Sequence, residues 1–315
     1  MSRDYSEDVM VEQPVIDILG QELTWATANV YDSEVFGAYG TIGRDSQADV
    51  LLKHRVLSSL RFLNPGLQES VYEGAFEVLN ANDSIKSTEE LNHIKYGFIK
   101  NGIPVTYKDE DGQLVRNKKL RVIDYDEPEN NNFLAVQQFW IQGKSKRMVR
   151  PDVVGFVNGI PLVFMELKRP SLKLRAAYEK NLKDYKDVVP RLFQFNAVII
   201  LSNGLESKIG SITSKFEHFS DWKRVSEEEE GIVSLDTIVK GVCHKDRLLD
   251  LLENFILYDT SKGSIVKLVA RNHQFIGVNK AVAHFKNARD QAKKGTITKD
   301  QSQRLGVFWH TQGSG

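Results

Sequence analysis

Two short apolar runs in the middle of the chain are separated by a turn signal. Val153–Val157 and Ile160–Leu167 are rich in branched and aromatic side chains, and Asn158-Gly159 stands between them. Asn-Gly between two apolar runs is typical of a tight hairpin turn, because both turn residues must adopt positive φ angles. The pattern therefore predicts two antiparallel strands.

Other stretches repeat apolar residues at helical spacing. Leu174–Val189 carries Leu174, Tyr178, Leu182 and Tyr185 on one side and is followed by Pro190, which predicts an amphipathic helix. The same reasoning predicts three earlier helices, the last two separated by Asn64-Pro65-Gly66: Met10–Leu23, Leu51–Leu63 and Leu67–Asn80.

Further strands complete an α/β pattern. Val122–Tyr125 and Phe133–Ile141 are expected to be strands on either side of a polar loop, and Ala197–Leu201 is a continuous aliphatic run. The run at Ala197 follows the helix that begins at Leu174, so strand, helix and strand make a parallel crossover. The fold class is therefore α/β, with a mixed sheet flanked by helices.

The chain is expected to divide after about residue 240. Glu227–Glu230 is a run of four acids that predicts a solvated loop, and an apolar helix follows over Leu248–Ile256. We assign residues 1–240 to a first domain and 241–315 to linker helices and the beginning of a second. No long low-complexity linker separates the two parts.

Composition and charge narrow the class of protein. The chain has 315 residues with 42 basic and 42 acidic side chains, so it carries no overall field that attracts nucleic acid. Cys243 is the single cysteine, which excludes an internal disulfide. Neither an export leader nor an apolar run long enough to span a membrane is visible. A cytoplasmic protein is expected.

The predicted hairpin carries candidate chemistry at its open end. Glu166 and Lys168 alternate with apolar residues, so their side chains share one face of the second strand. Asp152 directly precedes the first strand. One or two carboxylates with waters and a phosphate suit Mg²⁺, and a nearby lysine can orient water or stabilise developing charge. Asp152 and Glu166 are the candidate metal ligands for phosphodiester hydrolysis.

The register of the hairpin decides whether these side chains meet. A regular two-residue turn pairs Val157 with Ile160, which sets Asp152 opposite Met165 and on the wrong face. One residue more or less moves Asp152 opposite Glu166, and Gly155 or Pro161 permits such a bulge. We therefore predict an irregular hairpin.

Charged residues elsewhere have less specific interpretations. Glu12, on the first predicted helix, could lie near a metal, but a solvated charge is the favoured interpretation, and we do not assign it to the site. Basic residues cluster on both sides of the candidate site and could follow a DNA backbone or simply face solvent. They are Arg116, Lys118, Lys119, Arg121, Lys144, Lys146, Arg147, Arg150, Arg169, Lys173 and Arg175.

The central motifs resemble those of restriction nucleases with a Pro-Asp…Asp/Glu-x-Lys, or PD-(D/E)xK, motif. They more narrowly resemble the motor (R) subunit of type I restriction endonucleases, from about Glu12 onward. This resemblance implies an endonuclease domain, an ATP-driven translocase of double-stranded DNA, and partner modification and specificity subunits. The motifs are Arg150-Pro151-Asp152, Asn158-Gly159-Ile160-Pro161-Leu162 and Glu166-Leu167-Lys168.

The same resemblance points to two further catalytic candidates on the crossover helix. The family carries Gln-x-x-x-Tyr at this place, and here the two positions are Asn181 and Tyr185. Asparagine has the same donor and acceptor as glutamine on a shorter side chain, so its reach to the lysine or to DNA is in question. A tyrosine that only packs the helix is the alternative.

Nucleotide-binding candidates lie in the C-terminal stretch of the chain. Arg271 and Gln274 resemble the adenine-reading element of superfamily 2 helicases, placed before a helix that begins near Val278. The last residues, with Gly313 and Gly315, resemble a RecA-like P-loop that stops before its lysine and hydroxyl residue. ATP is therefore an expected cofactor of the full-length protein only.

Two other interpretations stay open. The chain could belong to another ATP-dependent nuclease of the same superfamily. It could also be a catalytically silent nuclease-like module that docks a partner or guides DNA for a motor. Binding of a divalent metal at Asp152 and Glu166, and cutting of DNA, distinguish the nuclease from the silent module.

Overall fold

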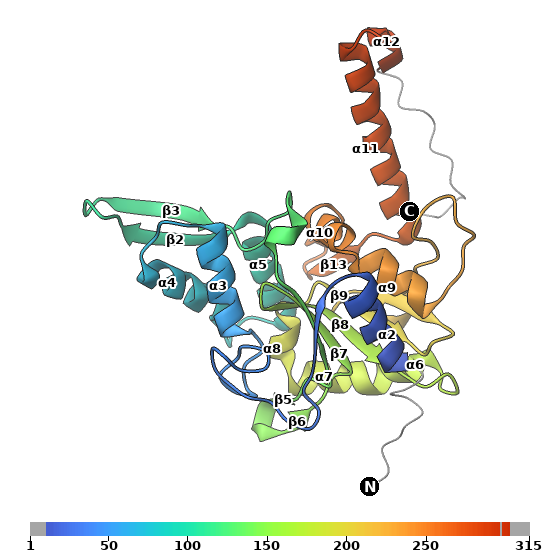
Figure 1. Cartoon of the computed structure of the whole chain (residues 1–315). Coiled ribbons are helices and arrows are strands. Elements are labelled where there is room, and N and C mark those ends of the chain that lie inside the picture. The colour runs from blue at the N-terminus through green and yellow to red at the C-terminus, as the bar shows by residue number, and fades with distance from the viewer. Residues whose placement is uncertain (1–10, 297, 303–315) are drawn as a thin grey trace.

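A seven-stranded mixed sheet forms the centre of the chain in the computed structural model, which describes residues 11–296 and 298–302 (Figure 1). The strand order is β1-β4-β7-β8-β9-β10-β11, and the β1–β4 and β8–β9 pairs are parallel while the others are antiparallel. The strands are β1 (Ala26–Asn29), β4 (Phe133–Gln137), β7 (Val153–Val157), β8 (Ile160–Leu167), β9 (Val198–Ser202), β10 (Ser207–Gly210) and β11 (Ser220–Asp221).

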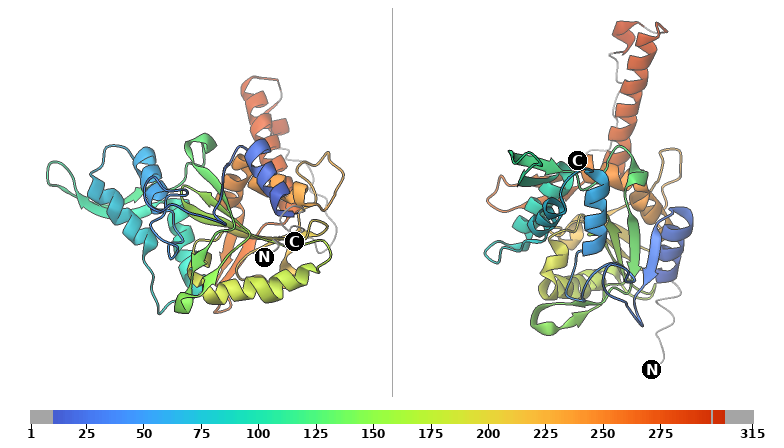
Figure 2. Two further views of the ribbon diagram at one scale, coloured as in Figure 1. Left: turned by 60° about the horizontal axis from the view of Figure 1, so that its bottom comes forward. Right: turned by 60° about the vertical axis from the view of Figure 1, so that its left-hand side comes forward.

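Helices cover both faces of this sheet. Figure 2 shows the crossover helix that joins β8 to β9 on one face, and α2 on the other. The longer helices are α3 (Lys53–Leu63), α4 (Glu69–Asn80), α5 (Thr88–Asn101), α9 (Leu235–Cys243), α10 (Lys245–Asn254) and α11 (Asn272–Lys293). The shorter ones are α2 (Gln13–Asp17), η2 (Ile18–Glu22), η3 (Pro128–Asn130), η4 (Lys144–Lys146), α6 (Leu174–Ala176), η5 (Ala177–Leu182), α7 (Lys183–Val188), α8 (Pro190–Phe193), η6 (Phe216–His218) and α12 (Lys299–Ser302).

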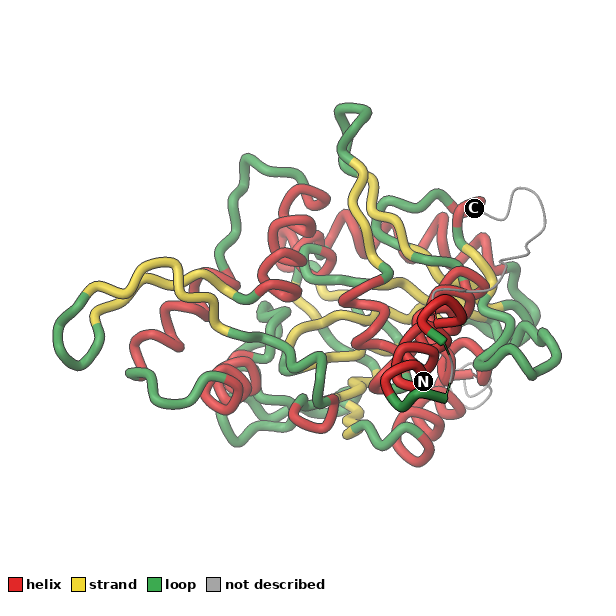
Figure 3. The backbone as a smooth tube through the Cα atoms, turned by 90° about the horizontal axis from the view of Figure 1, so that it is seen from above, coloured by secondary structure: helices red, strands yellow, loops and turns green. Residues whose placement is uncertain are grey.

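Three two-stranded ribbons stand beside the main sheet. The ribbon of β2 (Ile103–Lys108) and β3 (Leu114–Leu120) extends away from the sheet as an arm, visible in Figures 1 and 3. The others are β5 (Ile141–Gln142) with β6 (Met148–Val149), and β12 (Ile256–Asp259) with β13 (Val266–Val269). Helix α11 also projects from the body (Figure 2).

The hairpin of β7 and β8 is irregular, as its sequence predicts. Val157 pairs with Ile160 across the Asn158-Gly159 turn, but Gly155 pairs with Val163, so β8 contains one extra residue. Beyond this bulge Val153 pairs with Met165, which makes Asp152 and Glu166 the next neighbours. A single inserted residue thus moves Asp152 to the face of Glu166.

Strand directions bring several connections to one edge of the sheet. β1, β4, β8 and β9 run in one direction and β7 runs in the other. The carboxyl ends of these four strands and the amino end of β7 therefore lie at the same edge, which we call the Asp152 edge. Asp152 precedes β7, and Lys168 follows β8. The Asp152 edge is where side chains from distant parts of the sequence can meet.

The parallel crossover and most predicted helices are confirmed. β8 pairs with β9 in parallel, and the connecting helix covers 174–188. Helix α3 ends at Leu63, and α4 ends at Asn80. A π-helical segment, η5, interrupts the crossover helix, and another, η2, follows α2. The acidic run at 227–230 lies in an exposed loop, as expected.

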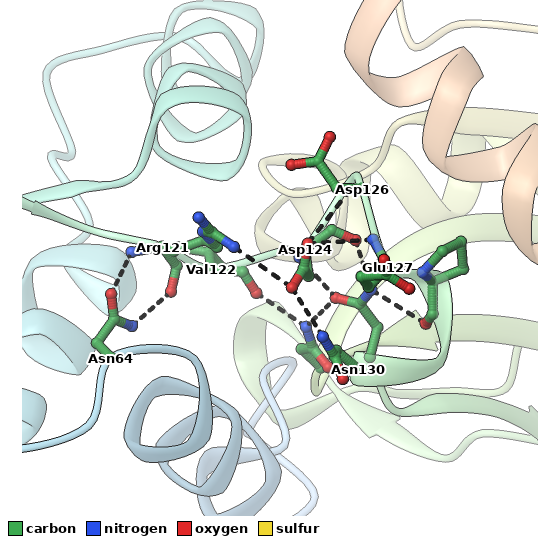
Figure 4. Close-up of polar contacts among 10 residues, drawn as sticks. Asn64, Arg121, Val122, Asp124, Asp126, Glu127 and Asn130 are labelled. Atoms are coloured by element: carbon green, nitrogen blue, oxygen red, sulfur yellow. Dashed lines mark hydrogen bonds and ion pairs between the residues drawn. The ribbon is translucent and has the colours of Figure 1, made fainter.

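One strand prediction was wrong, and another was too long. Residues 122–125 form a loop because Asp124 binds the local backbone: its Oδ1 accepts from the N–H groups of Asp126 and Glu127, and its Oδ2 accepts from Asn130 (Figure 4). Such side-chain contacts compete with strand pairing. The expected strand over 133–141 ends at Gln137, since Gln138 has a positive φ angle of 59°.

One hydrophobic core contains buried residues from Val11 to Phe275. It includes Leu248, Leu249, Leu251 and Leu252 of α10, the apolar helix found in the sequence. The division of the chain near residue 240 stays a prediction. In the described part of the chain, no helix is long and apolar enough to span a membrane.

Candidate active site at the Asp152 edge

Asp152, Glu166 and Lys168 meet at the end of the β7–β8 hairpin. The Lys168 ammonium lies 2.7 Å from Glu166 Oε1 and 4.0 Å from Asp152 Oδ2. The Leu167 backbone N–H donates to Asp152 Oδ2 at 2.7 Å, which fixes the carboxylate across the two strands. The bulge in β8 is the local cause of this arrangement, because it aligns the two carboxylates.

The three side chains are largely removed from water. Glu166 is fully buried, and the side chains of Asp152 and Lys168 are 15% and 13% exposed. Burial raises the pKa of Asp152 well above its ordinary value, and the charge of Glu166 raises this pKa further, while Lys168 opposes the rise. Two carboxylates facing one ammonium leave negative charge in a place that a cation can neutralise.

This raised pKa predicts how stability depends on pH. Between its ordinary pKa of 3.8 and the higher pKa in the folded chain, Asp152 binds a proton more tightly when folded than when unfolded. The contribution of Asp152 to the free energy of unfolding of the metal-free chain should therefore fall as the pH rises above about 4. Asp152→Asn should reduce this fall. Urea denaturation at several pH values in EDTA measures it, and an unchanged pH profile for Asp152→Asn would contradict the assignment.

Tyr185 supports the backbone beside Asp152. Its hydroxyl donates to the carbonyl oxygen of Arg150 at 2.9 Å, and its ring packs against Phe164 with centroids 5.4 Å apart. Burial raises its pKa, so the phenol stays protonated at neutral pH. Asn181 is half-buried in the π-helical segment η5. A role for Asn181 toward the lysine or DNA stays a prediction.

Glu12 reaches the same edge and is buried rather than solvated. It is 5% exposed, and its Oε2 accepts from Gln137 Nε2 at 3.2 Å and from Gln138 Nε2 at 2.5 Å. Its charge also raises the pKa of Asp152. The expectation of a solvated Glu12 was therefore wrong. The two glutamines that follow the apolar residues of β4 were the available sequence signal, because polar side chains at a strand end can bind a buried carboxylate.

The donor set at the edge fits a hard divalent cation. Asp152 and Glu166 offer carboxylate oxygens, and Mg²⁺ usually takes one or two carboxylates together with waters and substrate phosphate. No cluster of three acidic, histidine or cysteine side chains suited to a metal occurs in the part of the chain that the structure describes. A cation here would therefore have to complete its coordination with water or phosphate oxygen.

The basic clusters do not form one surface. Arg116, Lys118 and Lys119 lie exposed on β3, in the projecting arm. Arg147, in the loop before β6, forms two hydrogen bonds of 2.8 Å with Asp184. Arg175 pairs with Glu179 and Glu217. These two arginines are already bound to carboxylates, so a DNA path along them would require exchange of partners.

The adenine-reading candidates lie at the start of α11. The helix begins at Asn272 rather than near Val278, because the Gln274 side chain accepts a hydrogen bond from the Arg271 N–H at 2.8 Å and caps the first turn. Contact of Gln274 with adenine stays a prediction. Gly313 and Gly315 lie outside the residues that the structure describes.

Comparisons with known proteins agree on one family. The chain is 32% identical over 285 residues to the type I restriction enzyme HindI endonuclease subunit of Haemophilus influenzae, an alignment that covers 88% of this chain and 26% of the relative. It is 29% identical over 339 residues to a protein of Methanocaldococcus jannaschii provisionally named type I restriction enzyme MjaIXP endonuclease subunit, covering 98% of this chain and 30% of the relative.

The chain thus spans about a quarter to a third of the length of these relatives. A family model described as the type I restriction enzyme R protein N terminus matches residues 4–218. This match covers more than half of the chain and includes the β7–β8 hairpin with Asp152, Glu166 and Lys168. The chain belongs to the family of type I restriction enzyme R protein N termini.

Proposed function

We propose that this chain is the Mg²⁺-dependent endonuclease domain of a type I restriction enzyme R subunit, with a PD-(D/E)xK active site. The observation that carries the proposal is the pair of carboxylates, Asp152 and Glu166, set side by side next to the Lys168 ammonium by a bulge in one hairpin. A regular hairpin with the same residues would separate them. The names of the two relatives support the same activity.

Each side chain has a chemical role in this proposal. Asp152 and Glu166 would hold Mg²⁺, which supplies Lewis-acid activation of water and of the scissile phosphate when bound. Lys168 would orient the attacking water or stabilise charge that develops on the phosphate oxygens. The Tyr185 hydroxyl holds the backbone at Arg150, two residues before Asp152, and keeps the carboxylate in position.

The rest of the proposed function concerns a longer protein. We propose double-stranded DNA as the substrate, modification and specificity subunits as partners, and ATP-driven translocation by a RecA-like motor that begins within residues 241–315. The support is the family match and the names of the two relatives, whose chains are about three to four times as long as the matched region. Gln274 would contact adenine only after α11 rearranges at its first turn, since its side chain now caps that helix.

A calorimetric titration with Mg²⁺ tests the metal site directly. The chain should bind Mg²⁺ with heat that saturates at one ion per chain, and Asp152→Ala should remove this binding, because a single remaining carboxylate beside Lys168 is a poor cation site. Asp111→Ala is the matched control, since Asp111 is an exposed carboxylate in the turn of the β2–β3 arm. Unchanged binding by Asp152→Ala would favour a silent docking module.

A further inference from the structure

The Arg150 guanidinium contacts two aromatic rings, which belong to residues at the Asp152 edge. Its guanidinium carbon is 4.4 Å from the centroid of the Tyr31 ring and 4.9 Å from that of the Trp140 ring. Arg150 is half-buried and stands two residues before Asp152, a span of about 7 Å along an extended chain. A positively charged residue therefore stands two positions before a candidate metal ligand in the chain.

The two rings are held by contacts of their own. The indole N–H of Trp140 donates to the carbonyl oxygen of Tyr31 at 3.1 Å. The carbonyl oxygen of Trp140 accepts a hydrogen bond of 2.7 Å from the buried Arg44. Tyr31 follows β1 and Trp140 follows β4, both at the Asp152 edge. The two rings that contact Arg150 are thus held in place from two separate strands.

The Arg150 charge differs from that of the neighbouring arginines. Arg44 pairs with Glu34, and Arg147 pairs with Asp184. No acidic side chain among residues 11–296 and 298–302 forms an ion pair with Arg150, so the rings stabilise its charge instead. Contact with the rings orders the guanidinium, and its N–H groups point outward in the plane of the guanidinium itself, where they can donate to an anion.

We infer that Arg150 binds a phosphate of the DNA backbone next to the scissile one and sets the strand in register with Asp152 and Glu166. The inference rests on the proposed nuclease function. A guanidinium matches phosphate with two parallel hydrogen bonds, and stacking reduces the entropy lost on binding. One DNA strand carries a phosphate about every 3.4 Å of helix axis, so neighbouring phosphates fall within reach of both sites. Tyr31 and Trp140 are positioning residues for Arg150.

Binding of a fluorescein-labelled 20-base-pair duplex to this chain in EDTA, where cutting is absent, tests the contact. Arg150→Gln should weaken binding about three- to tenfold and reduce the slope of log affinity against log salt by about one, because one phosphate contact releases about one counterion. Arg150→Lys keeps the charge but loses the planar fork. It should retain the slope while binding more weakly than the unaltered chain.

Arg147→Gln is the matched control. It also removes one positive charge, three residues before Arg150, but from an arginine that is already bound by Asp184. Its salt slope should stay close to that of the unaltered chain. Tyr31→Leu should weaken binding without changing the slope. An unaltered chain that does not bind, an unchanged slope for Arg150→Gln, or an equal loss for Arg147→Gln overturns the inference. Where Arg150→Gln does not fold, an Arg150→Lys chain that binds as well as the unaltered chain overturns it.

The phosphate contact and the cutting chemistry can fail separately. In one outcome, Arg150→Gln reduces the slope of log affinity against log salt, and Asp152→Ala still cuts DNA fully in Mg²⁺. This outcome would contradict the proposed nuclease site and still support an arginine that binds phosphate. Loss of cutting by Asp152→Ala with no change of slope in Arg150→Gln would keep the nuclease and remove the Arg150 contact.

Discussion

Asp152→Ala, Glu166→Ala and Lys168→Ala are each expected to reduce cutting of double-stranded DNA by the assembled restriction enzyme by about a thousandfold or more. Removal of one preorganised charge-stabilising group from an active site commonly costs about 10² to 10³ in rate. Loss of a metal ligand here removes one of only two adjacent carboxylates that the hairpin supplies. Conversion of supercoiled to linear plasmid in the presence of Mg²⁺ and ATP measures the effect.

The controls separate chemistry from folding. Asp152→Asn preserves the size of the side chain and an oxygen that can accept from the Leu167 N–H, so it should fold like the unaltered chain and still lose cutting. Asp111→Ala, on the projecting arm, should cut normally. Full cutting by any one of the three alanine variants would exclude that residue from the active site, and full cutting by all three would exclude the site.

Glu34→Ala is expected to lower the free energy of unfolding by about 3–5 kcal/mol, because it leaves a buried arginine without its partner. The side chains of Arg44 and Glu34 are 0% and 3% exposed, and two hydrogen bonds of 2.7 and 2.6 Å join them. Arg44 also stacks on Phe139 at 4.2 Å. The Arg44–Glu34 pair stabilises the long connection between β1 and α3, and Arg44 also binds the carbonyl oxygen of Trp140. Urea denaturation measures the change.

Two comparisons make this expectation specific. Glu69→Ala breaks the Arg61–Glu69 ion pair, whose side chains are 43% and 52% exposed, and should change the free energy of unfolding far less, because water and salt screen an exposed pair. The double variant Glu34→Leu with Arg44→Met removes both charges and should recover much of the lost stability, since apolar side chains of similar size can replace a buried pair. Equal losses for Glu34→Ala and Glu69→Ala would show that burial of the Arg44 pair has no special cost.

The sequence was sufficient where the pattern was local. The Asn158-Gly159 turn, the strands on either side and the crossover helix follow from apolar periodicity and turn chemistry, and each is present. The irregular register could also be inferred, because a regular turn left Asp152 on the wrong face. The sequence did not indicate which strand carries the extra residue. The structure places this residue in β8, opposite the Gly155–Phe156 step.

Long-range contacts were beyond the reach of the pattern. Glu12 is separated from Gln137 by 125 residues, and only the parallel pairing of β1 with β4 brings their neighbourhoods together. The contact of Arg150 with the Tyr31 ring likewise joins residues more than a hundred positions apart. The strand predicted over residues 122–125 does not form, because the Asp124 carboxylate accepts from backbone N–H groups that strand pairing would use. These interactions depend on three-dimensional proximity rather than on spacing.

The π-helical segment η5 has a consequence for how the spacing of Asn181 and Tyr185 is interpreted. Asn181 lies within η5, and Tyr185 lies just beyond it, in the α-helical segment α7. A π turn joins residues five apart and an α turn joins residues four apart, so the two kinds of turn rotate successive side chains by different amounts. The direction of the Asn181 side chain relative to the Tyr185 ring therefore depends on the local type of helix as well as on the four-residue spacing.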